Sequence, residues 1–236
     1  YFPHYLFILI ILVLTVGLVF LQPDLGSMIV IFVSGFFVIL AAYPKKRFVF
    51  AMILFFIISL PVVWHGLADY QKARIDTFLH PNKDPLGASY NQIQAVIAVG
   101  SGQLMGKGLG RGTQSRLQFL PEKHTDFFFA TLAEELGFMG AVTIILLYFL
   151  LSARLLYLFS IAHKPVLRMV FLGVFALFFF QAMIHIGINI GILPVTGITL
   201  PFLSVGGSSM LASWLTLGIA SSASCTIRSD RAIFLR

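Results

Sequence analysis

The stretch FLPEKHTDFFFATLAEELGF, residues 119 to 138, contains four of the chain's nine Asp and Glu residues. Glu122 and Asp126 lie four positions apart just before an apolar run, and Glu134 and Glu135 follow. Carboxylates beside an apolar segment are costly unless they face water or partners, and repulsion together with desolvation raises the pKa of at least one of them. A raised pKa suits a general base at neutral pH. We expect Asp126, at the boundary of the apolar run, to be that base.

These acids also have a structural interpretation, because acidic residues are favourable at the start of a helix. In the segment TDFFFA, Asp126 would then cap the helix that follows. A similar turn, QPDLG at residues 22–26, places Asp24 where it can cap the next helix, and there we favour the structural role. The residues alone leave the capping role and the chemical role of Asp126 both open.

A glycine-rich segment, GQLMGKGLGRGTQSR at residues 102–116, precedes the acidic cluster. It does not match the P-loop pattern, so nucleotide binding is not predicted. Glycines allow the backbone to approach a ligand closely, and neighbouring cations can hold a phosphate. One interpretation is a diphosphate clamp, and the other is an ordinary flexible turn. The clamp would use Lys107, Arg111, Arg116 and Lys123.

Polar side chains recur every four residues in an otherwise apolar segment, at Gln181, His185 and Asn189. This spacing places them on one face of a helix, and in lipid such a face normally points to the bundle or to a cavity. The stripe therefore predicts either a substrate groove or interhelical hydrogen bonds. A metal site at His185 is not expected, because the sequence offers no second cluster of ligands to support it.

The elements that must position these residues are predicted to be membrane-spanning helices. The chain is 58% hydrophobic and only 11% charged, with a mean hydropathy of +0.95, whereas a soluble domain carries about a quarter charged residues. A span needs roughly 17 to 25 mainly apolar residues. We therefore predict an all-α polytopic membrane protein that forms a single membrane domain over residues 1–236. Its six spans are expected at about 5–21, 26–43, 48–65, 128–158, 168–190 and 203–226.

Short basic loops orient these spans, because cytoplasmic loops are rich in Lys and Arg. The segments 43–47 and 153–168 are the best cytoplasmic candidates, which places both ends of the chain inside and residues 66–126 outside. Within that large outer loop, YNQIQAVIAVGSG at 90–102 predicts a short amphipathic helix at the membrane interface. A second outer segment, 191–209, has two prolines and four glycines. It predicts a re-entrant stretch lining a cavity, since irregular backbone at membrane depth needs protein or water around it.

The net charge of +7 bears on partners. In a membrane protein it favours contact with anionic membrane lipid or with phosphate-bearing lipid substrates. Nucleic acid is not an expected partner, because no basic helix or interleaving of aromatic and basic residues occurs on a soluble module.

Four stretches taken together resemble the SEDS family of RodA, FtsW and SpoVE, the polytopic peptidoglycan polymerases of bacteria. They are QPDLGS (22–27), DPLGASYNQIQAVIAVGSGQLMGKG (84–108), GTQSRLQFLPEKHTDFFFATLAEELGF (112–138) and GILPVTGITLPFLSVGGSS (191–209). The element LPEKHTDF inside a long outer loop is highly specific, and its surroundings are closest to RodA, the elongation member. His185, Thr199 and Val205 depart from the residues usual in RodA-like chains, and Gln118 replaces an acid of some relatives.

The resemblance implies a ten-helix SEDS fold of which this chain is the C-terminal part, with residues 66–126 as the large extracytoplasmic loop. It implies a multi-pass protein of the bacterial plasma membrane whose C-terminus is cytoplasmic. Asp126 matches the family's catalytic aspartate. The expected partners are lipid II, a class B penicillin-binding protein acting as transpeptidase, and other cell-wall elongation proteins. The expected substrate-binding residues are Lys107, Arg111, Arg116, Glu122, Lys123, His124, Gln181 and Asn189.

The implied reaction is an inverting glycosyl transfer that polymerises lipid II and releases undecaprenyl diphosphate. Asp126 would accept the proton of the acceptor hydroxyl, and either the Lys/Arg set or a divalent cation (Mg²⁺ or Mn²⁺) would stabilise the leaving diphosphate. A second hypothesis is a lipid II flippase that uses the polar stripe at 181–189 as its path. A third is a noncatalytic scaffold for a transpeptidase. A flippase should tolerate Asp126→Asn and lose activity when Gln181 or Asn189 is made apolar.

Overall fold

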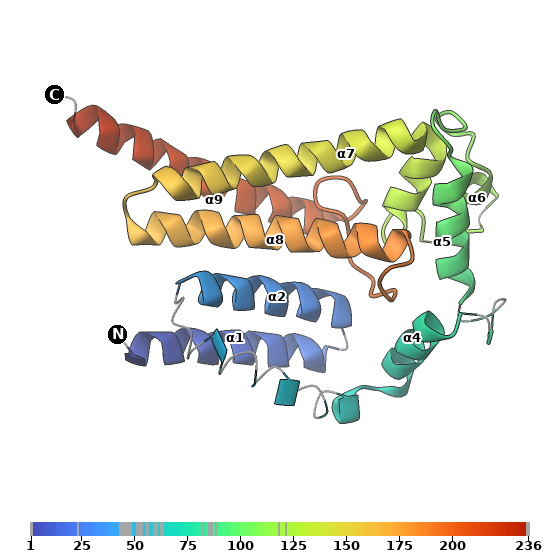
Figure 1. The fold of residues 1–236 in the computed structure, drawn as a ribbon, viewed down its shortest axis with the longest axis horizontal. Helices are drawn as coiled ribbons and strands as arrows, with labels where there is room; N and C mark the ends of the chain where they lie inside the picture. Colours follow the sequence, from blue (N-terminus) through green and yellow to red (C-terminus); the bar gives the residue numbers. More distant parts are fainter. Residues whose placement is uncertain are drawn as a thin grey trace.

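Long apolar helices make up most of the computed structural model. The structure describes residues 2–22, 24–42, 49–50, 54, 57–58, 61, 64–81, 83–84, 87, 89–117, 119–120 and 122–234, and these contain no β-strand. The helices, shown in Figure 1, are α1 Phe2–Leu21, α2 Leu25–Ala42, α4 Asp69–Leu79, α5 Tyr90–Ser101, α6 Thr113–Arg116, α7 Phe128–Ile161, α8 Pro165–Asn189 and α9 Gly207–Phe234.

Among the described residues, four helices are long and apolar enough to cross a membrane: α2, α7, α8 and the part of α9 from Gly207 to Ile227. The apolar part of α1, Phe7–Leu21, is shorter. These five helices coincide with five of the six predicted spans. The sixth, 48–65, falls mostly outside the described residues, so the number of six spans stays a prediction. Large apolar side chains such as Leu14, Leu147 and Phe149 are more than half exposed, where lipid would cover them.

Helix α8 is the centre of the bundle. It lies between α2 and α7, and α1 packs on the far side of α2 (Figure 1). Half of the most apolar window of α8 is buried, against 28%, 22% and 17% for α2, α7 and α9. Phe171 and Phe178 of α8 are fully buried in a cluster with Leu155 of α7 and Ala220 of α9. A polar residue on α8 is therefore more constrained than one on any other described span.

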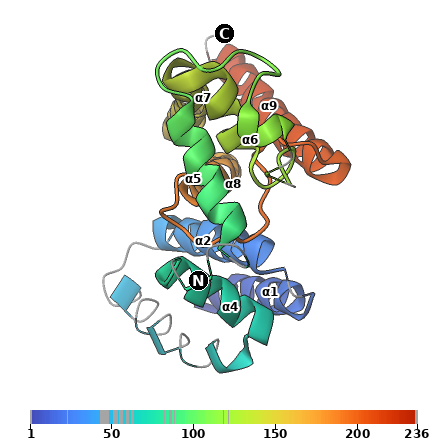
Figure 2. The same cartoon turned by 90° about the vertical axis from the view of Figure 1, so that its right-hand side faces the viewer.

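Two shorter helices close one end of the bundle. Helix α5 runs across the ends of α7 and α8, and α4 lies near the corresponding end of α1 and α2 (Figure 2). The fully buried Ala95 and Ala98 of α5 pack in one cluster with Phe127, Ala130 and Ile188, which small side chains allow at close range. Helix α5 forms where the amphipathic pattern predicts it. Helix α4 was not predicted, because its segment has no apolar stripe and looks like connecting loop.

Helix α7 is broken at Gly137, which adopts φ 68° and ψ −164°. The nitrogen of Gly106 would be 2.3 Å from a Cβ at this position, so only glycine lets the two backbones meet. The glycine-rich segment docks there through main-chain bonds. Lys107 N–H and Gly108 N–H donate to carbonyls of residues 134 and 135, each at 3.0 Å, and Phe138 N–H donates to the carbonyl of residue 103 at 2.7 Å. This stretch is therefore a docked loop.

Candidate active site

Asp126 lies in a tight turn that leads directly into α7. The N–H groups of Thr125 and Phe127 donate to the Glu122 carbonyl oxygen at 3.3 and 3.1 Å, and the Thr125 hydroxyl donates to the Glu122 carboxylate at 3.1 Å. The half-buried Asp126 carboxylate faces Gly197, because its Oδ2 would be 3.6 Å from a Cβ on that glycine. Gly197 has a φ of +80°, which favours glycine. No side chain from this position therefore crowds the carboxylate.

Asn189, at the end of α8, fixes the position of this turn. Its Nδ2 donates to the Asp126 carbonyl at 3.0 Å and to the His185 carbonyl at 2.8 Å, and its Oδ1 accepts from Ala130 N–H at 2.9 Å. Ala130 is in the first turn of α7, where N–H groups lack helical partners. Asn189 thus performs the capping role that the sequence offered to Asp126. The Asp126 carboxylate is left available for chemistry.

The irregular segment between α8 and α9 holds the other side of the turn. Ser204 Oγ donates to the Thr125 carbonyl at 2.9 Å and accepts from Leu200 N–H at 2.8 Å. Val205 N–H donates to the His124 carbonyl at 2.8 Å. This segment occupies the first residues of the predicted span 203–226, so α9 begins four residues later than expected. The Asp126 turn is therefore held from α8 and from the 197–205 segment.

The rest of the polar stripe on α8 binds the same irregular segment. His185 is fully buried and its Nδ1 lies 2.7 Å from the Ile198 carbonyl, and Gln181 Nε2 donates to the Thr199 carbonyl at 3.0 Å. All three side chains of the stripe thus bind main-chain atoms of neighbouring segments. This geometry favours the structural alternative of hydrogen bonds within the bundle. Substrate binding by Gln181 and Asn189 stays a prediction.

The start of α2 supports the segment that faces Asp126. A Cβ on Gly26 would lie 2.7 Å from the Thr196 carbonyl oxygen and 2.7 Å from the Ile198 side chain. The absence of that Cβ is what lets α2 lie directly against this segment. Asp24 Oδ1 accepts from Ser27 N–H at 3.0 Å, which confirms its predicted role as the cap of α2.

The environment of Asp126 raises the pKa of its carboxyl above the ordinary aspartate value. Burial is the largest cause, and the negative charges of Glu122 and Asp24 act in the same direction. A hydrogen bond from Thr125 and the positive charge of Arg74 oppose the shift. The predicted direction is therefore confirmed, with desolvation contributing more than repulsion. A carboxylate in this state is a stronger proton acceptor than an exposed aspartate.

Glu134, two turns further along α7, has a different environment. Its fully buried Oε1 accepts from Lys107 Nζ at 2.8 Å, from Thr113 Oγ1 at 3.1 Å and from Gln114 N–H at 3.0 Å. Lys107 Nζ also donates to Thr113 Oγ1 at 2.7 Å. The structure thus separates Glu134 from the Asp126 turn. Lys107 forms an ion pair with Glu134. Diphosphate binding by Lys107 would have to compete with this buried pair.

The other predicted substrate-binding residues lie on the turn and the docked loop. Glu122, His124 and Arg111 are exposed, and Lys123 is half-buried. Arg116 ends α6, but its side chain is outside what the structure describes, as is Gln118. The structure therefore brings Glu122, Lys123 and His124 to the Asp126 turn through the chain itself. A convergence of all four cations of the predicted clamp is not shown.

Sequence reasoning missed Arg74 and Tyr70, both on α4. They line a cavity of about 250 Å³ with Ala73, Thr77, Gln92 and Val195. The only signal in the sequence was that Arg74 is one of seven Lys and Arg residues in the 66–126 loop. Its closeness to Asp126 depends on how α4 and the 191–203 segment come together, which spacing does not reveal.

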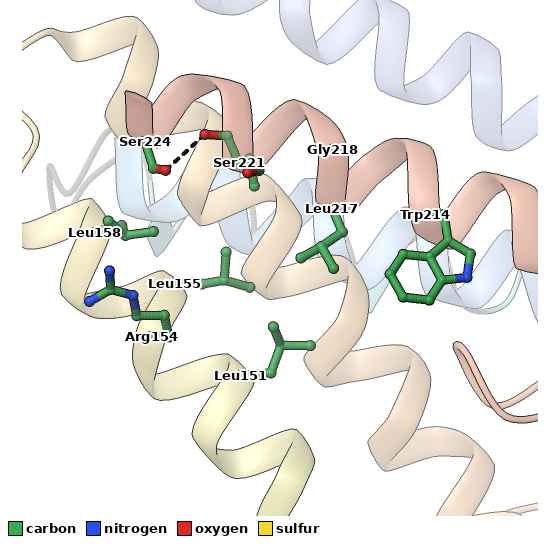
Figure 3. Close-up of a pocket in the computed structure, with 10 residues that line it drawn as sticks. Leu151, Arg154, Leu155, Leu158, Trp214, Leu217, Gly218, Ser221 and Ser224 are labelled. Atoms are coloured by element: carbon green, nitrogen blue, oxygen red, sulfur yellow. Dashed lines mark hydrogen bonds between the residues drawn. The ribbon is translucent and has the colours of Figure 1, made fainter. Parts of the chain in front are cut away.

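A larger cavity, about 450 Å³, lies between α7 and α9 and is lined mainly by apolar side chains (Figure 3). Its α7 residues, 151 to 158, are in the half of that helix farthest from Asp126, so it is separate from the candidate site. It is lined by Leu151, Arg154, Leu155, Leu158, Trp214, Leu217, Gly218, Ala220, Ser221 and Ser224.

A metal ion is the remaining ligand considered for the site. Within the described ranges, no three or more His, Cys, Asp or Glu side chains are grouped to hold one. Mg²⁺, however, often uses only one or two carboxylates together with substrate phosphates. Asp126 and Glu122 could supply such carboxylates, so Mg²⁺ or Mn²⁺ remains a prediction.

Comparison with known proteins agrees with this picture. Residues 3–229 match the model of the FtsW/RodA/SpoVE cell cycle protein family. "Peptidoglycan glycosyltransferase MrdB" of Escherichia coli K12 is 43% identical over 206 residues, covering 87% of this chain and 56% of that protein. "Probable peptidoglycan glycosyltransferase FtsW" of Pseudoalteromonas translucida is 40% identical, covering 86% and 51% respectively. The chain thus spans about half the length of these curated relatives.

Solved structures show the same similarity. One, described as "Structural coordination of polymerization and crosslinking by a peptidoglycan synthase complex", superposes with a TM-score of 0.74 at 32% identity over 95% of this chain and 62% of that chain. A crystal structure of the rod shape determining protein RodA of Thermus thermophilus, with one aspartate replaced by alanine, gives a TM-score of 0.55 at 27% identity over 92% and 55%. The multi-pass helical chain described here therefore belongs to the FtsW/RodA/SpoVE family.

Proposed function

We propose that the protein is a peptidoglycan glycosyltransferase that polymerises lipid II into glycan strands and releases undecaprenyl diphosphate. The observation that carries this proposal is the position of the half-buried Asp126. Its main chain is held from two sides, while its carboxylate is not used to cap α7. The names of the relatives, which are peptidoglycan glycosyltransferases, support the same activity.

In the proposed reaction, the 4-hydroxyl of the acceptor GlcNAc attacks the anomeric carbon of the donor MurNAc. The hydroxyl proton passes to the Asp126 carboxylate as the new glycosidic bond forms. The bond between the anomeric carbon and the diphosphate breaks, and the diphosphate oxygen keeps the electron pair. General-base catalysis of this kind accelerates a reaction by roughly 10² to 10⁴-fold. A single displacement inverts the α-linked donor to a β-linked product.

We propose that the complete topology has six spans in this part of the protein, with residues 48–65 forming the third. In this arrangement residues 66–126 form an extracytoplasmic loop of a single membrane domain, and the C-terminus is cytoplasmic. The clustering of the end of α1, the start of α2, α4, α5 and the 190–206 segment at one end of the bundle supports this arrangement (Figures 1 and 2). Asp126 would then lie at the outer surface of the plasma membrane, where exported lipid II is available.

The proposed partners follow from the same function. A class B penicillin-binding protein would cross-link the strands that this protein makes, together with other proteins of cell-wall elongation. The solved complex, described by its coordination of polymerization and crosslinking, supports a transpeptidase partner. A closer relation to elongation than to division is proposed from the LPEKHTDF surroundings and from the 43% identity to MrdB.

The flippase hypothesis has less support. It needs a polar path along α8, but Gln181, His185 and Asn189 all bind main-chain atoms inside the bundle. Opening such a path would break hydrogen bonds of buried groups, each of which costs about 1–3 kcal/mol when left unsatisfied.

The test uses the complete natural protein, purified with a class B penicillin-binding protein and supplied with labelled lipid II. We expect glycan strands from the wild type and none from Asp126→Asn. Asp69→Asn is the matched control, because it removes an exposed acid from α4 and should leave polymerisation unchanged. Equal polymer from wild type and Asp126→Asn removes Asp126 as the base. No polymer from the wild type, with lipid II transport intact, favours the flippase.

A further inference from the structure

One face of α4 lines a cavity near the candidate active site. Residues 70, 73, 74 and 77 line it, and this i, i+3, i+4, i+7 spacing places them on a single side of the helix. Gln92 of α5 and Val195 complete the lining of the cavity, whose volume is about 250 Å³. The helix that sequence analysis missed therefore contributes most of this site.

A short piece of main chain connects the cavity to the residue that faces Asp126. Gln92 Nε2 donates to the Leu193 carbonyl at 3.4 Å, which ties α5 to the cavity wall formed by Val195. Two residues beyond Val195, Gly197 faces the Asp126 carboxylate, with 3.6 Å between Oδ2 and the position a Cβ would take. The main chain from Val195 to Gly197 therefore connects the wall of the cavity to the residue that faces the proposed base.

Arg74 is the cation of this cavity. Its guanidinium lies 6.0 Å from the centre of the Tyr70 ring, a cation–π distance that holds the side chain on the cavity face. Among the described residues, no carboxylate lies within ion-pair distance of Arg74. Its positive charge nevertheless opposes the rise in the pKa of Asp126, so the two groups interact across the site. Arg74 thus offers an exposed guanidinium, whereas Lys107 is committed to Glu134.

We propose that the α4 cavity binds the diphosphate of the polyprenyl-linked donor, with Arg74 as its principal ligand. This inference rests on the proposed glycosyltransferase function and adds a cation from α4 that the predicted clamp did not include. A guanidinium stays charged at every working pH and can donate two parallel hydrogen bonds to phosphate oxygens. Charge grows on the diphosphate as its bond to the sugar breaks, so Arg74 would assist binding and also departure of the leaving group.

Binding is measured with the complete natural protein in nanodiscs of neutral phosphatidylcholine. All variants carry Asp126→Asn, which prevents turnover. The probe is undecaprenyl diphosphate, with undecaprenyl monophosphate for comparison. We expect Arg74→Gln to weaken diphosphate-lipid binding by about tenfold or more and Arg74→Lys to weaken it less, because lysine keeps the charge but loses the paired donors. Lys72→Gln removes a charge from another face of α4 and should change affinity by less than about twofold.

Inorganic diphosphate distinguishes two sources of the same chemistry. Displacement of the lipid by inorganic diphosphate, lost in Arg74→Gln, means that the site recognises the diphosphate itself. Failure to displace, with lipid binding still dependent on Arg74, means that the site needs the lipid-linked form. Both results support Arg74 as the residue that binds the diphosphate.

Equal lipid affinity in Arg74→Gln and its parent overturns the inference and leaves the polymerase proposal standing. If Arg74→Gln does not fold, Arg74→Met removes the charge in its place, and unchanged affinity there overturns the inference equally. Absence of polymer from the wild type would instead refute the proposed function while leaving the binding result intact.

Discussion

Two carboxylates at the start of α7 are held in opposite ways. Glu134 is fully buried, and its oxygen accepts from a lysine, a threonine and a main-chain N–H. Asp126 is half-buried, and the charges acting on it include two acids, Glu122 and Asp24, whose effects raise its pKa. The turn before α7 thus holds a carboxylate that is destabilised as an anion, and the first turns of α7 hold one that is stabilised as an anion.

This difference indicates that Glu134 has a structural role and that Asp126 has a chemical one. The Glu134 pair fastens the 102–116 segment to the break in α7, and its donors favour the ionised form. At Asp126 the protein instead fixes the main chain, through Asn189 and Ser204, and leaves the carboxylate with an increased affinity for protons. A carboxylate whose ionised form is destabilised in this way is typical of a functional site.

The largest expected effect comes from removing the functional member of this comparison. Asp126→Asn should lower the polymerisation rate by roughly 10² to 10⁴-fold, the contribution typical of a general base. The stability of the folded protein should not decrease. Because the folded-state pKa of Asp126 is raised, its ionisation reduces stability once the pH exceeds the ordinary aspartate pKa, and asparagine avoids this loss. A thermal midpoint at pH 7 equal to or above that of the wild type, together with lost turnover, is the expected result. A marked drop in the midpoint would assign Asp126 a structural role.

The converse change removes the partner of the structural carboxylate. Lys107→Met removes one partner of the buried Lys107–Glu134 ion pair, a change that typically costs about 3–5 kcal/mol, here towards the lower end because Thr113 and Gln114 still donate to Glu134. Reversible unfolding in detergent measures the loss. Arg111→Met on the same loop is the control, because this exposed cation should change stability by less than about 0.5 kcal/mol. Equal effects of the two substitutions would show that the buried pair does not fasten the loop.

A smaller effect tests how the main chain of Asp126 is held. Asn189→Leu removes the hydrogen bonds to Asp126, Ala130 and His185, with an expected loss of about 2–3 kcal/mol because the freed groups are buried. Gln181→Leu removes one hydrogen bond of a half-buried side chain and should cost about 1 kcal/mol.

Kinetics separates positioning from mere stability in these two variants. Measured below both melting temperatures, Asn189→Leu should lower kcat while Gln181→Leu leaves it close to the wild-type value. If Gln181→Leu abolishes lipid transport instead, the flippase hypothesis gains the support it now lacks.

The smallest expected effect is a shift in the pH dependence of turnover. A general base must be ionised, so kcat should rise with pH through the pKa of Asp126, which lies above the ordinary aspartate value. Asp24→Asn removes a negative neighbour and should move this rise to lower pH. Asparagine also caps helices well, so α2 should be preserved. A profile that does not move with Asp24→Asn would show that another group controls the rate.

Hydropathy predicted the five long helices that the structure describes, because lipid makes long apolar runs nearly unavoidable for a helix that crosses a membrane. The predicted and observed bounds differ mainly at α9, where Ser204 and Val205 bind the Asp126 turn and delay the start of the helix. Asp126 was found from the cluster of acids beside an apolar run. For its pKa, the sequence predicted only that the value is raised. The main cause, burial, depends on segments far apart in the sequence.

Other features could not be predicted because they arise from contacts between distant segments. Lys107 and Glu134 are 27 positions apart, and nothing in either stretch indicates their pairing. The break at Gly137 depends on the close approach of Gly106, which sequence periodicity cannot show. Arg74 lies on a helix without a strong apolar stripe. The residues missed are those whose role is set by a partner on another element.

The break in α7 has a consequence for local opening of the protein. The N–H groups of Phe138 and Met139 donate to the carbonyls of Gln103 and Leu104, at 2.7 and 3.3 Å, in place of partners one turn back in their own helix. Their amide protons can therefore exchange with solvent deuterium only when the glycine-rich loop leaves α7, whereas their neighbours further along the helix stay protected. These two amides form a built-in reporter of loop docking, readable in the intact protein by hydrogen exchange without an attached probe.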